Sequence, residues 1–183
     1  MNKNKSQIIC DSKELTKIIN QISSQIQKKY SNKIQNVVLI GILSAGYPIA
    51  QRISKEVFKN ISVNIPVGKL DIAIYRDDLL AREDFVPIRE SDIPFDIENK
   101  IVILIDDVLF HGRTIRAALN GLLDFGSPKA IELAVLIDRG HKELPIFANY
   151  IGKEIKTNKT DYINVSLVEI GDKDSIVLEG LKK

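Results

Sequence analysis

Two adjacent carboxylates, Asp106 and Asp107, stand between an apolar run at residues 101–105 and a short segment that contains Gly112 and Thr114. An uninterrupted apolar run of this length is typical of a strand buried on both faces of a parallel sheet. The residues after Thr114 have the 3.6-residue period of a helix, which we expect to end near Gly126. The free amides at the start of such a helix, beside a glycine and a hydroxyl, suit a phosphate.

Carboxylates repel a phosphate unless another group lies between them, and a sugar can be that group. Its hydroxyls would donate hydrogen bonds to Asp106 and Asp107 while its 5-phosphate binds in the loop, and the acids would favour positive charge on the ring. A solvated turn is the simpler explanation of two acids after a strand, but the length of the whole pattern argues against it. Gly41 and Gly46 have the spacing of a P-loop, yet Tyr47 stands where lysine is required.

Other apolar runs predict the elements that position these groups. The run at residues 37–43 ends at Ser44-Ala45-Gly46 and precedes a helix expected over residues 48–59, and the run at 131–137 ends at Asp138. In an open α/β sheet, ligands bind outside the carboxyl ends of the strands. Further strands are expected at residues 67–75, 162–170 and 175–178, and a first helix begins at the capping pair Asp11 and Glu14.

Residues 76–96 have no sustained period but are charged, with Arg76, Arg82 and Arg89 among them. Such a loop of about twenty residues is uncommon in a compact domain and is usually functional when it is ordered. It predicts a lid that excludes water from a reacting centre. The alternative is a surface excursion.

A chain of 183 residues, 44% hydrophobic and 27% charged, suits a single domain spanning residues 1–183. Its formal net charge of +2 implies no strong field toward nucleic acid or membranes. Cys10 is the single cysteine, which fits a reducing compartment, and two histidines are too few for a convincing zinc site. With no apolar run near ~20 residues and no signal peptide, we expect a cytoplasmic protein without membrane contact.

The apolar strand, the paired acids and the loop that ends in Gly-Arg-Thr resemble the phosphoribosyl-pyrophosphate (PRPP) motif of type I phosphoribosyltransferases. The resemblance implies an α/β fold with a central, mostly parallel sheet flanked by helices and a flexible lid loop. It also implies that Asp106 and Asp107 face the ribose hydroxyls and that the loop Ser44-Ala45-Gly46 holds the pyrophosphate. The 5-phosphate is expected at Val108, Leu109, Phe110, His111, Gly112, Arg113 and Thr114.

Three segments together resemble the PyrR family, over nearly the whole chain. They are DIAIYRDDL (residues 71–79), DDVLFHGRTIRA (106–117) and LAVLIDRGHKELPIFANYIGKEI (133–155). The resemblance implies that uracil and PRPP give UMP and pyrophosphate with Mg²⁺. It further implies a homo-oligomer that often binds the leader of pyrimidine mRNA.

By the same resemblance, Arg76 is a cation for the leaving pyrophosphate, and uracil lies near Asp138 and Arg139. The residues expected to meet RNA are His141, Lys142 and Lys153. Mg²⁺ should arrive with PRPP, because the protein has no cluster that could hold a metal alone.

The sequence also departs from the family pattern. Ala45 stands where the pyrophosphate loop usually has arginine, and His111 where threonine is usual. On the RNA side, Asn20-Gln21 and Ser24 lack the usual basic groups, and Phe147 replaces an arginine. Three hypotheses therefore stay open: an active uracil phosphoribosyltransferase, a nucleotide-sensing RNA regulator with little catalysis, or a phosphoribosyltransferase for another base such as a purine.

Overall fold

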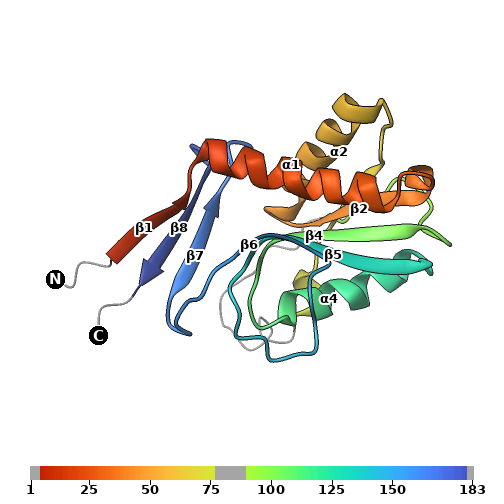
Figure 1. Cartoon of the computed structure of the whole chain (residues 1–183). Coiled ribbons are helices and arrows are strands. Elements are labelled where there is room, and N and C mark those ends of the chain that lie inside the picture. The colour runs from red at the N-terminus through yellow and green to blue at the C-terminus, as the bar shows by residue number, and fades with distance from the viewer. Residues whose placement is uncertain (1–4, 77–89, 181–183) are drawn as a thin grey trace.

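A central sheet of five parallel strands organises the computed structural model, which describes residues 5–76 and 90–180. The strand order is β3-β2-β4-β5-β6 (Figure 1). The strands are β2 (Val37–Ile42), β3 (Val67–Leu70), β4 (Ile101–Leu109), β5 (Ala130–Asp138) and β6 (Tyr150–Glu154). The predicted α/β class with a parallel sheet is confirmed.

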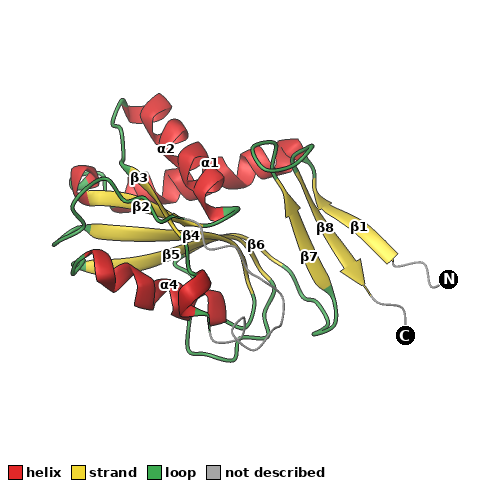
Figure 2. Cartoon of the chain, turned by 180° about the vertical axis from the view of Figure 1, so that it is seen from behind, coloured by secondary structure: helices red, strands yellow, loops and turns green. Residues whose placement is uncertain are grey.

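Helices cover both faces of this sheet. Helices α1 (Ser12–Lys29) and α2 (Gly46–Ile61) lie on one face, and α4 (Arg113–Leu122) lies on the other (Figures 1 and 2). Three short 3₁₀ turns, η1 (Ile34–Asn36), η2 (Ala73–Tyr75) and η3 (Leu123–Phe125), join the elements. The predicted cap of α1 is a full capping box, in which the Asp11 carboxylate accepts a hydrogen bond from the Glu14 amide at 2.9 Å. None of the described helices is long and apolar enough to cross a membrane.

The apolar runs are continuous because the sheet is buried on both faces. Alternate side chains of β2 and β4 enter different hydrophobic clusters, since successive side chains of a strand point to opposite faces. Leu39 and Ile103 pack with residues of α1 and α2. Val38 and Leu104 pack with residues of α4.

A second, antiparallel sheet lies beyond the carboxyl ends of the central strands (Figure 1). Its order is β1-β8-β7, with β1 (Lys5–Cys10), β7 (Tyr162–Ser166) and β8 (Ser175–Gly180). The sequence analysis expected β7 and β8 but missed β1. Its short segment forms a strand through pairing with β8 at the other end of the chain, which no local pattern reveals.

Several predicted boundaries were wrong. Strand β4 does not end before the acids but continues through them to Leu109, because this segment keeps pairing with β5. The strand expected over residues 67–75 ends at Leu70, where the Asp71 carboxylate accepts a hydrogen bond from the Ala73 amide and the chain turns into η2. The strand expected over residues 162–170 ends at Ser166.

Most of the predicted lid, including Arg82 and Arg89, falls at residues 77–89, outside the described residues. Its two ends are described. Arg76 follows η2, and Asp92 pairs in an antiparallel bridge with Lys69 of β3.

Candidate active site

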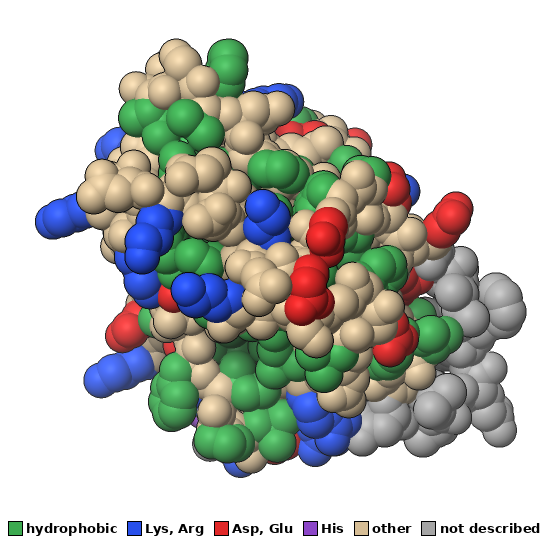
Figure 3. Space-filling model, turned by 90° about the vertical axis from the view of Figure 1, so that its right-hand side faces the viewer, with side chains coloured by type: hydrophobic (Ala, Val, Ile, Leu, Met, Phe, Trp, Pro, Cys, Tyr) green, Lys and Arg blue, Asp and Glu red, His purple; other side chains and the backbone are tan. Residues whose placement is uncertain are grey.

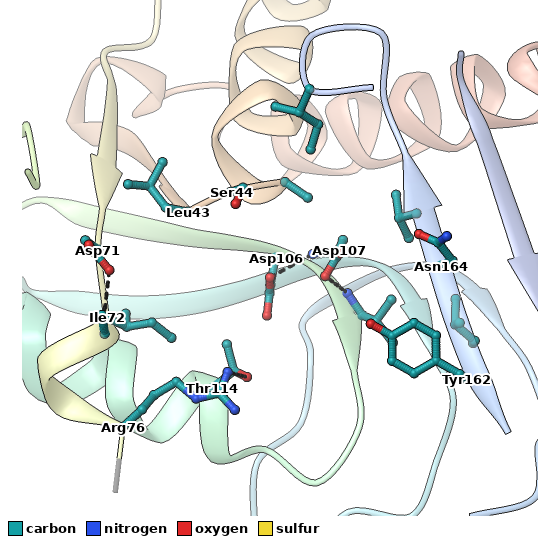
Figure 4. Close-up of a pocket in the computed structure, with 16 residues that line it drawn as sticks. Leu43, Ser44, Asp71, Ile72, Arg76, Asp106, Asp107, Thr114, Tyr162 and Asn164 are labelled. Carbon is teal, nitrogen blue, oxygen red and sulfur yellow. Dashed lines mark hydrogen bonds between the residues drawn. The ribbon is translucent and has the colours of Figure 1, made fainter. Parts of the chain in front are cut away.

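The acid pair lies at the carboxyl end of β4, where the two side chains reach a cavity (Figure 4). Asp106 is 7% exposed, and Asp107 is partly buried. The Asp106 carboxylate accepts a hydrogen bond from the Asp107 amide at 3.0 Å, and the Asp107 carboxylate accepts one from the Val108 amide at 2.7 Å. These local bonds fix the direction of both carboxylates while leaving lone pairs for a ligand.

Burial governs the charge of this pair. It raises the pKa of Asp106 well above its ordinary value, and the nearby charge of Asp107 raises this pKa further. Burial also raises the pKa of Asp107. Two partly desolvated carboxylates side by side are costly to ionise. A ligand that brings hydroxyl donors, a positive charge or a metal ion would relieve this cost.

The predicted phosphate loop surrounds a small cavity of about 110 Å³ at the start of α4. Gly112, with a positive φ of 90°, precedes the first helical residue, and no side-chain cap is described there. The amides of the first turn therefore point toward the cavity with the positive end of the helix dipole, which suits an anion. The Arg76 guanidinium lies 3.5 Å from the Thr114 hydroxyl at the same place.

The aromatic side chains of this loop pack against each other and against Arg139. Phe110 stacks on His111 with ring centroids 3.5 Å apart, and the Arg139 guanidinium lies 3.9 Å from the Phe110 centroid. Arg113 is paired with Glu143 at 3.0 Å. These contacts hold the side chains of the loop, so we expect its backbone amides and Thr114 to supply any contacts to a phosphate.

The predicted pyrophosphate loop leads into α2 as the predicted phosphate loop leads into α4, with no side-chain cap described at the start of the helix. Its first peptide bond, Leu43–Ser44, is cis, and Ala45 occupies the cap position with no side-chain cap described. Gly46 lies against the backbone of β4, where an added Cβ would overlap the carbonyl oxygen of Ile105. Only glycine allows this close approach, which brings the amides at the start of α2 next to the acid pair.

One cavity of about 530 Å³ brings seven of the predicted site residues together. Ser44, Ala45, Arg76, Asp106, Asp107, Val108 and Thr114 all line it. Asp71 also lines this cavity, as do Tyr162 and Asn164 of β7 (Figure 4). The sequence analysis did not assign these three to the site. The alternation of β7 indicated a strand, but nothing in its spacing linked that strand to the acids.

Asp138 and Arg139 line a different cavity, of about 570 Å³, at the carboxyl ends of β5 and β6. Asp138 is buried and accepts hydrogen bonds from the Lys142 ammonium at 2.6 and 2.9 Å. Arg139 donates to the Thr157 hydroxyl at 3.2 Å and to the Asn158 carbonyl at 2.9 Å. These two side chains are thus engaged with protein partners and do not share the cavity of the acid pair.

The basic residues predicted to meet RNA lie in and beside this second cavity. His141 and Lys142 line it, and the His141 ring lies 2.7 Å from the Thr157 carbonyl oxygen. Lys153 donates to the Ile9 carbonyl at 3.2 Å. Figure 3 shows a different side of the molecule, the right-hand side of Figure 1, where acidic and basic side chains both occur with apolar side chains between them.

Comparison with known proteins agrees with this geometry. A model of the phosphoribosyl transferase domain matches residues 6–169. The chain is 44% identical to the bifunctional protein PyrR of Alkaliphilus metalliredigens, with 97% of each chain covered. It is 42% identical to that of Clostridioides difficile, over 93% of this chain and 96% of the relative.

Solved structures share the fold at lower identity. A hypoxanthine phosphoribosyltransferase from Staphylococcus aureus superposes with a TM-score of 0.67 at 22% identity, covering 96% of this chain and 92% of that one. The enzyme of the same name from Trypanosoma cruzi gives 0.72 at 16% identity, covering 96% and 97%. From the domain match and the full-length identity to its relatives, the chain belongs to the PyrR family of phosphoribosyltransferases.

Proposed function

We propose that this protein is a uracil phosphoribosyltransferase that converts uracil and PRPP into UMP and pyrophosphate. The observation that carries the proposal is the convergence of three anion-binding features on one acid pair. The amides at the starts of α2 and α4 and the Arg76 guanidinium all border the cavity that Asp106 and Asp107 line. A ribose with a phosphate at one end and a pyrophosphate at the other matches this arrangement.

In the proposed reaction, the chain's main task is to stabilise charge. The amides at the start of α4 hold the 5-phosphate, which fixes the ribose above β4. Asp106 and Asp107 accept hydrogen bonds from the ribose hydroxyls and stabilise the positive charge that develops on the ring as the bond to pyrophosphate breaks. The amides at the start of α2 and Arg76 stabilise the negative charge on the departing group.

The donor set fits a Mg²⁺ ion that arrives with PRPP. Among residues 5–76 and 90–180, no group of three or more His, Cys, Asp or Glu side chains could hold a metal ion. The acid pair nevertheless offers oxygen ligands, and Mg²⁺ commonly combines one or two carboxylates with water and substrate phosphates. When bound, the ion would neutralise charge on the pyrophosphate.

We place uracil between the acid pair and the β7 wall of the same cavity. Asp138 and Arg139, which the family resemblance puts near uracil, line the neighbouring cavity, where Lys142 and Thr157 hold their side chains. The β7 wall is uncharged and includes Asn164. A carboxamide has both a donor and an acceptor, which suits the alternating polar edge of a pyrimidine.

The test is PRPP consumption with uracil, hypoxanthine and orotate supplied separately. We expect turnover with uracil and at least about tenfold lower kcat/KM with the other two bases. A preference for hypoxanthine would favour a purine enzyme. Tight UMP binding without turnover would favour a regulator with little catalysis.

A second function, RNA binding, is suggested by the family, whose members are named bifunctional. We propose that binding to a pyrimidine mRNA leader is weak here, because Lys142 is engaged with Asp138 and Lys153 with the Ile9 carbonyl. A homo-oligomer would bring several such groups together on one surface. We propose that the protein acts in the cytoplasm, because a reducing compartment keeps a free thiol such as that of Cys10 reduced.

A further inference from the structure

A charge cluster joins α2 to the second sheet. The guanidinium of Arg52 on α2 donates four hydrogen bonds to two carboxylates. Its contacts with Glu169 measure 2.8 and 2.5 Å, and those with Asp174 are both 2.8 Å. Both acids belong to the turn between β7 and β8, far from Arg52 in the sequence. Two bidentate pairs on one guanidinium are a geometrically demanding arrangement that lysine cannot reproduce.

The cluster connects two walls of the active-site cavity. Helix α2 begins at the pyrophosphate loop, so Arg52 is rigidly linked to Ser44 and Ala45. The turn that carries Glu169 and Asp174 also carries Ile170, which lines the same cavity as the β7 residues. The cluster therefore fixes how far the uncharged wall stands from the pyrophosphate loop and the acids.

The electrostatics of the cluster make Arg52 hard to replace. Its side chain is 17% exposed, and that of Asp174 is 16% exposed. Hydrogen bonds from Arg52 lower the pKa of both Glu169 and Asp174, while the charge of Asp174 opposes that shift in Glu169. Without the guanidinium, two like charges would face each other, and like charges at short range repel. We expect the turn to move away from α2 in that case.

We propose that Arg52 is a positioning residue that holds the β7 wall at the distance needed to bind the base, an inference that rests on the proposed function. The wall is uncharged, whereas the phosphates of PRPP are bound by the helix starts and Arg76. Loosening the wall should therefore weaken the binding of uracil more than that of PRPP.

The experiment compares Arg52→Lys, Arg52→Ala and the near-isosteric double variant Glu169→Gln with Asp174→Asn. We expect KM for uracil to rise roughly tenfold in Arg52→Ala, with kcat and KM for PRPP within about twofold of the wild type. Arg52→Lys should be intermediate. Lys59→Ala is the matched control, since Lys59 lies on the same helix, is 72% exposed and makes a 3.7 Å pair with Glu56.

A purely structural role would lower kcat through loss of folded enzyme and leave KM for uracil unchanged, and that result would overturn the proposal. Hydrogen–deuterium exchange gives a readout independent of turnover. Residues 162–178 should exchange faster in the Arg52 variants than in Lys59→Ala, and equal exchange would also overturn it. If the wild type does not use uracil, the proposed function fails, and the exchange result alone decides whether Arg52 holds the wall.

Discussion

The carboxyl ends of β4 and β5 are neighbours in the sheet and both carry buried acids, yet the two ends are built differently. Asp106 on β4 and Asp138 on β5 have the same 7% exposure. Asp138 is neutralised by the Lys142 ammonium at 2.6 Å. The Asp106 carboxylate accepts a hydrogen bond from the backbone amide of Asp107. The neighbouring charge is that of another acid, Asp107, which raises the pKa of Asp106.

This difference indicates that the Asp138 carboxylate stabilises the fold, whereas the Asp106 and Asp107 carboxylates are available to a ligand. A buried carboxylate with an ammonium partner is satisfied within the protein, whereas two adjacent buried carboxylates raise the free energy of the folded state. A protein that maintains such a pair does so at a cost in stability. In the proposed function, the binding of a substrate with hydroxyls and a metal ion would recover that cost, which is why we propose the end of β4 as the reactive one.

The sharpest test of this comparison is the double variant Asp106→Asn with Asp107→Asn. UMP synthesis should fall by roughly 10³-fold, because the developing charge on the ribose loses its two counter-charges. The free energy of unfolding at neutral pH should stay the same or rise. The pKa values of the two acids are higher in the folded state than in the unfolded state, so their ionisation destabilises the fold. The loss of unfolding free energy grows as pH rises from the unfolded-state pKa toward the folded-state pKa. Asparagine does not ionise, so the variant does not suffer this loss.

Urea unfolding across the acid and neutral range, together with a UMP assay, measures both effects. The exposed Asp172 provides the control, as Asp172→Asn should change neither. An unfolded double variant, or one with normal turnover, would refute the assignment of the acid pair.

The opposite effect on stability is expected at the end of β5. Lys142→Met should lower the unfolding free energy by about 1–3 kcal/mol, because the Asp138 carboxylate is left buried without its charged partner. The side chain of Lys142 is 22% exposed, which keeps the loss below the ~3–5 kcal/mol typical of a fully buried pair. Asp138→Asn in the same background should restore part of the loss in a double-mutant cycle. An additive cycle would show that the pair is not coupled.

A third test addresses the pyrophosphate loop beside the acids. Ala45→Arg should raise kcat or lower KM for PRPP by about tenfold, since a well-placed donor can contribute up to ~2.7–4 kcal/mol to the transition state. Ala45→Leu adds bulk without charge and should not improve either constant. Equal behaviour of the two variants would show that Arg76 already supplies the cation that this loop lacks.

Proton release on substrate binding is a smaller but diagnostic effect. Binding of PRPP with Mg²⁺ should lower the raised pKa values of the acid pair and release protons at mildly acid pH. Titration calorimetry in two buffers of different ionisation enthalpy measures the number released. In the double asparagine variant this number should fall toward that of free Mg²⁺ and PRPP, and no change would show that the pair does not meet the ligand.

The smallest effect is expected near the end of β5, at the residues predicted to meet RNA. Phe147 is 73% exposed, and the Lys142 ammonium lies 5.8 Å from its ring. Phe147→Arg should increase the affinity for a pyrimidine-operon leader several-fold and steepen the salt dependence by about one counterion. Filter binding of leader and scrambled RNA, with and without UMP at two ionic strengths, measures this. Nanomolar, UMP-enhanced binding of the leader by the wild type would contradict our proposal of weak binding.

The sequence predicted four of the five strands of the central sheet, missing β6, and the residues at the ends of β2 and β4, because these depend on local patterns. Apolar runs that end in acids or small residues mark strand ends, and the parallel fold brings those ends together. The Tyr162 and Asn164 wall and the Arg52 cluster were not predictable in this way. They arise between segments that are distant in the sequence, for which no local period exists; Arg52 and Glu169, for example, are 117 residues apart.

The glycine contact between the pyrophosphate loop and β4 limits how this enzyme could be redesigned. Backbone touches backbone at Gly46 and Ile105, so any side chain placed at residue 46 would push the two segments apart. If PRPP binds as we propose, the distance between its pyrophosphate and its ribose is therefore set by the main chain. A designer who wants another nucleobase should leave this region untouched and build a library over residues 162–170, where side chains rather than main chain form the boundary.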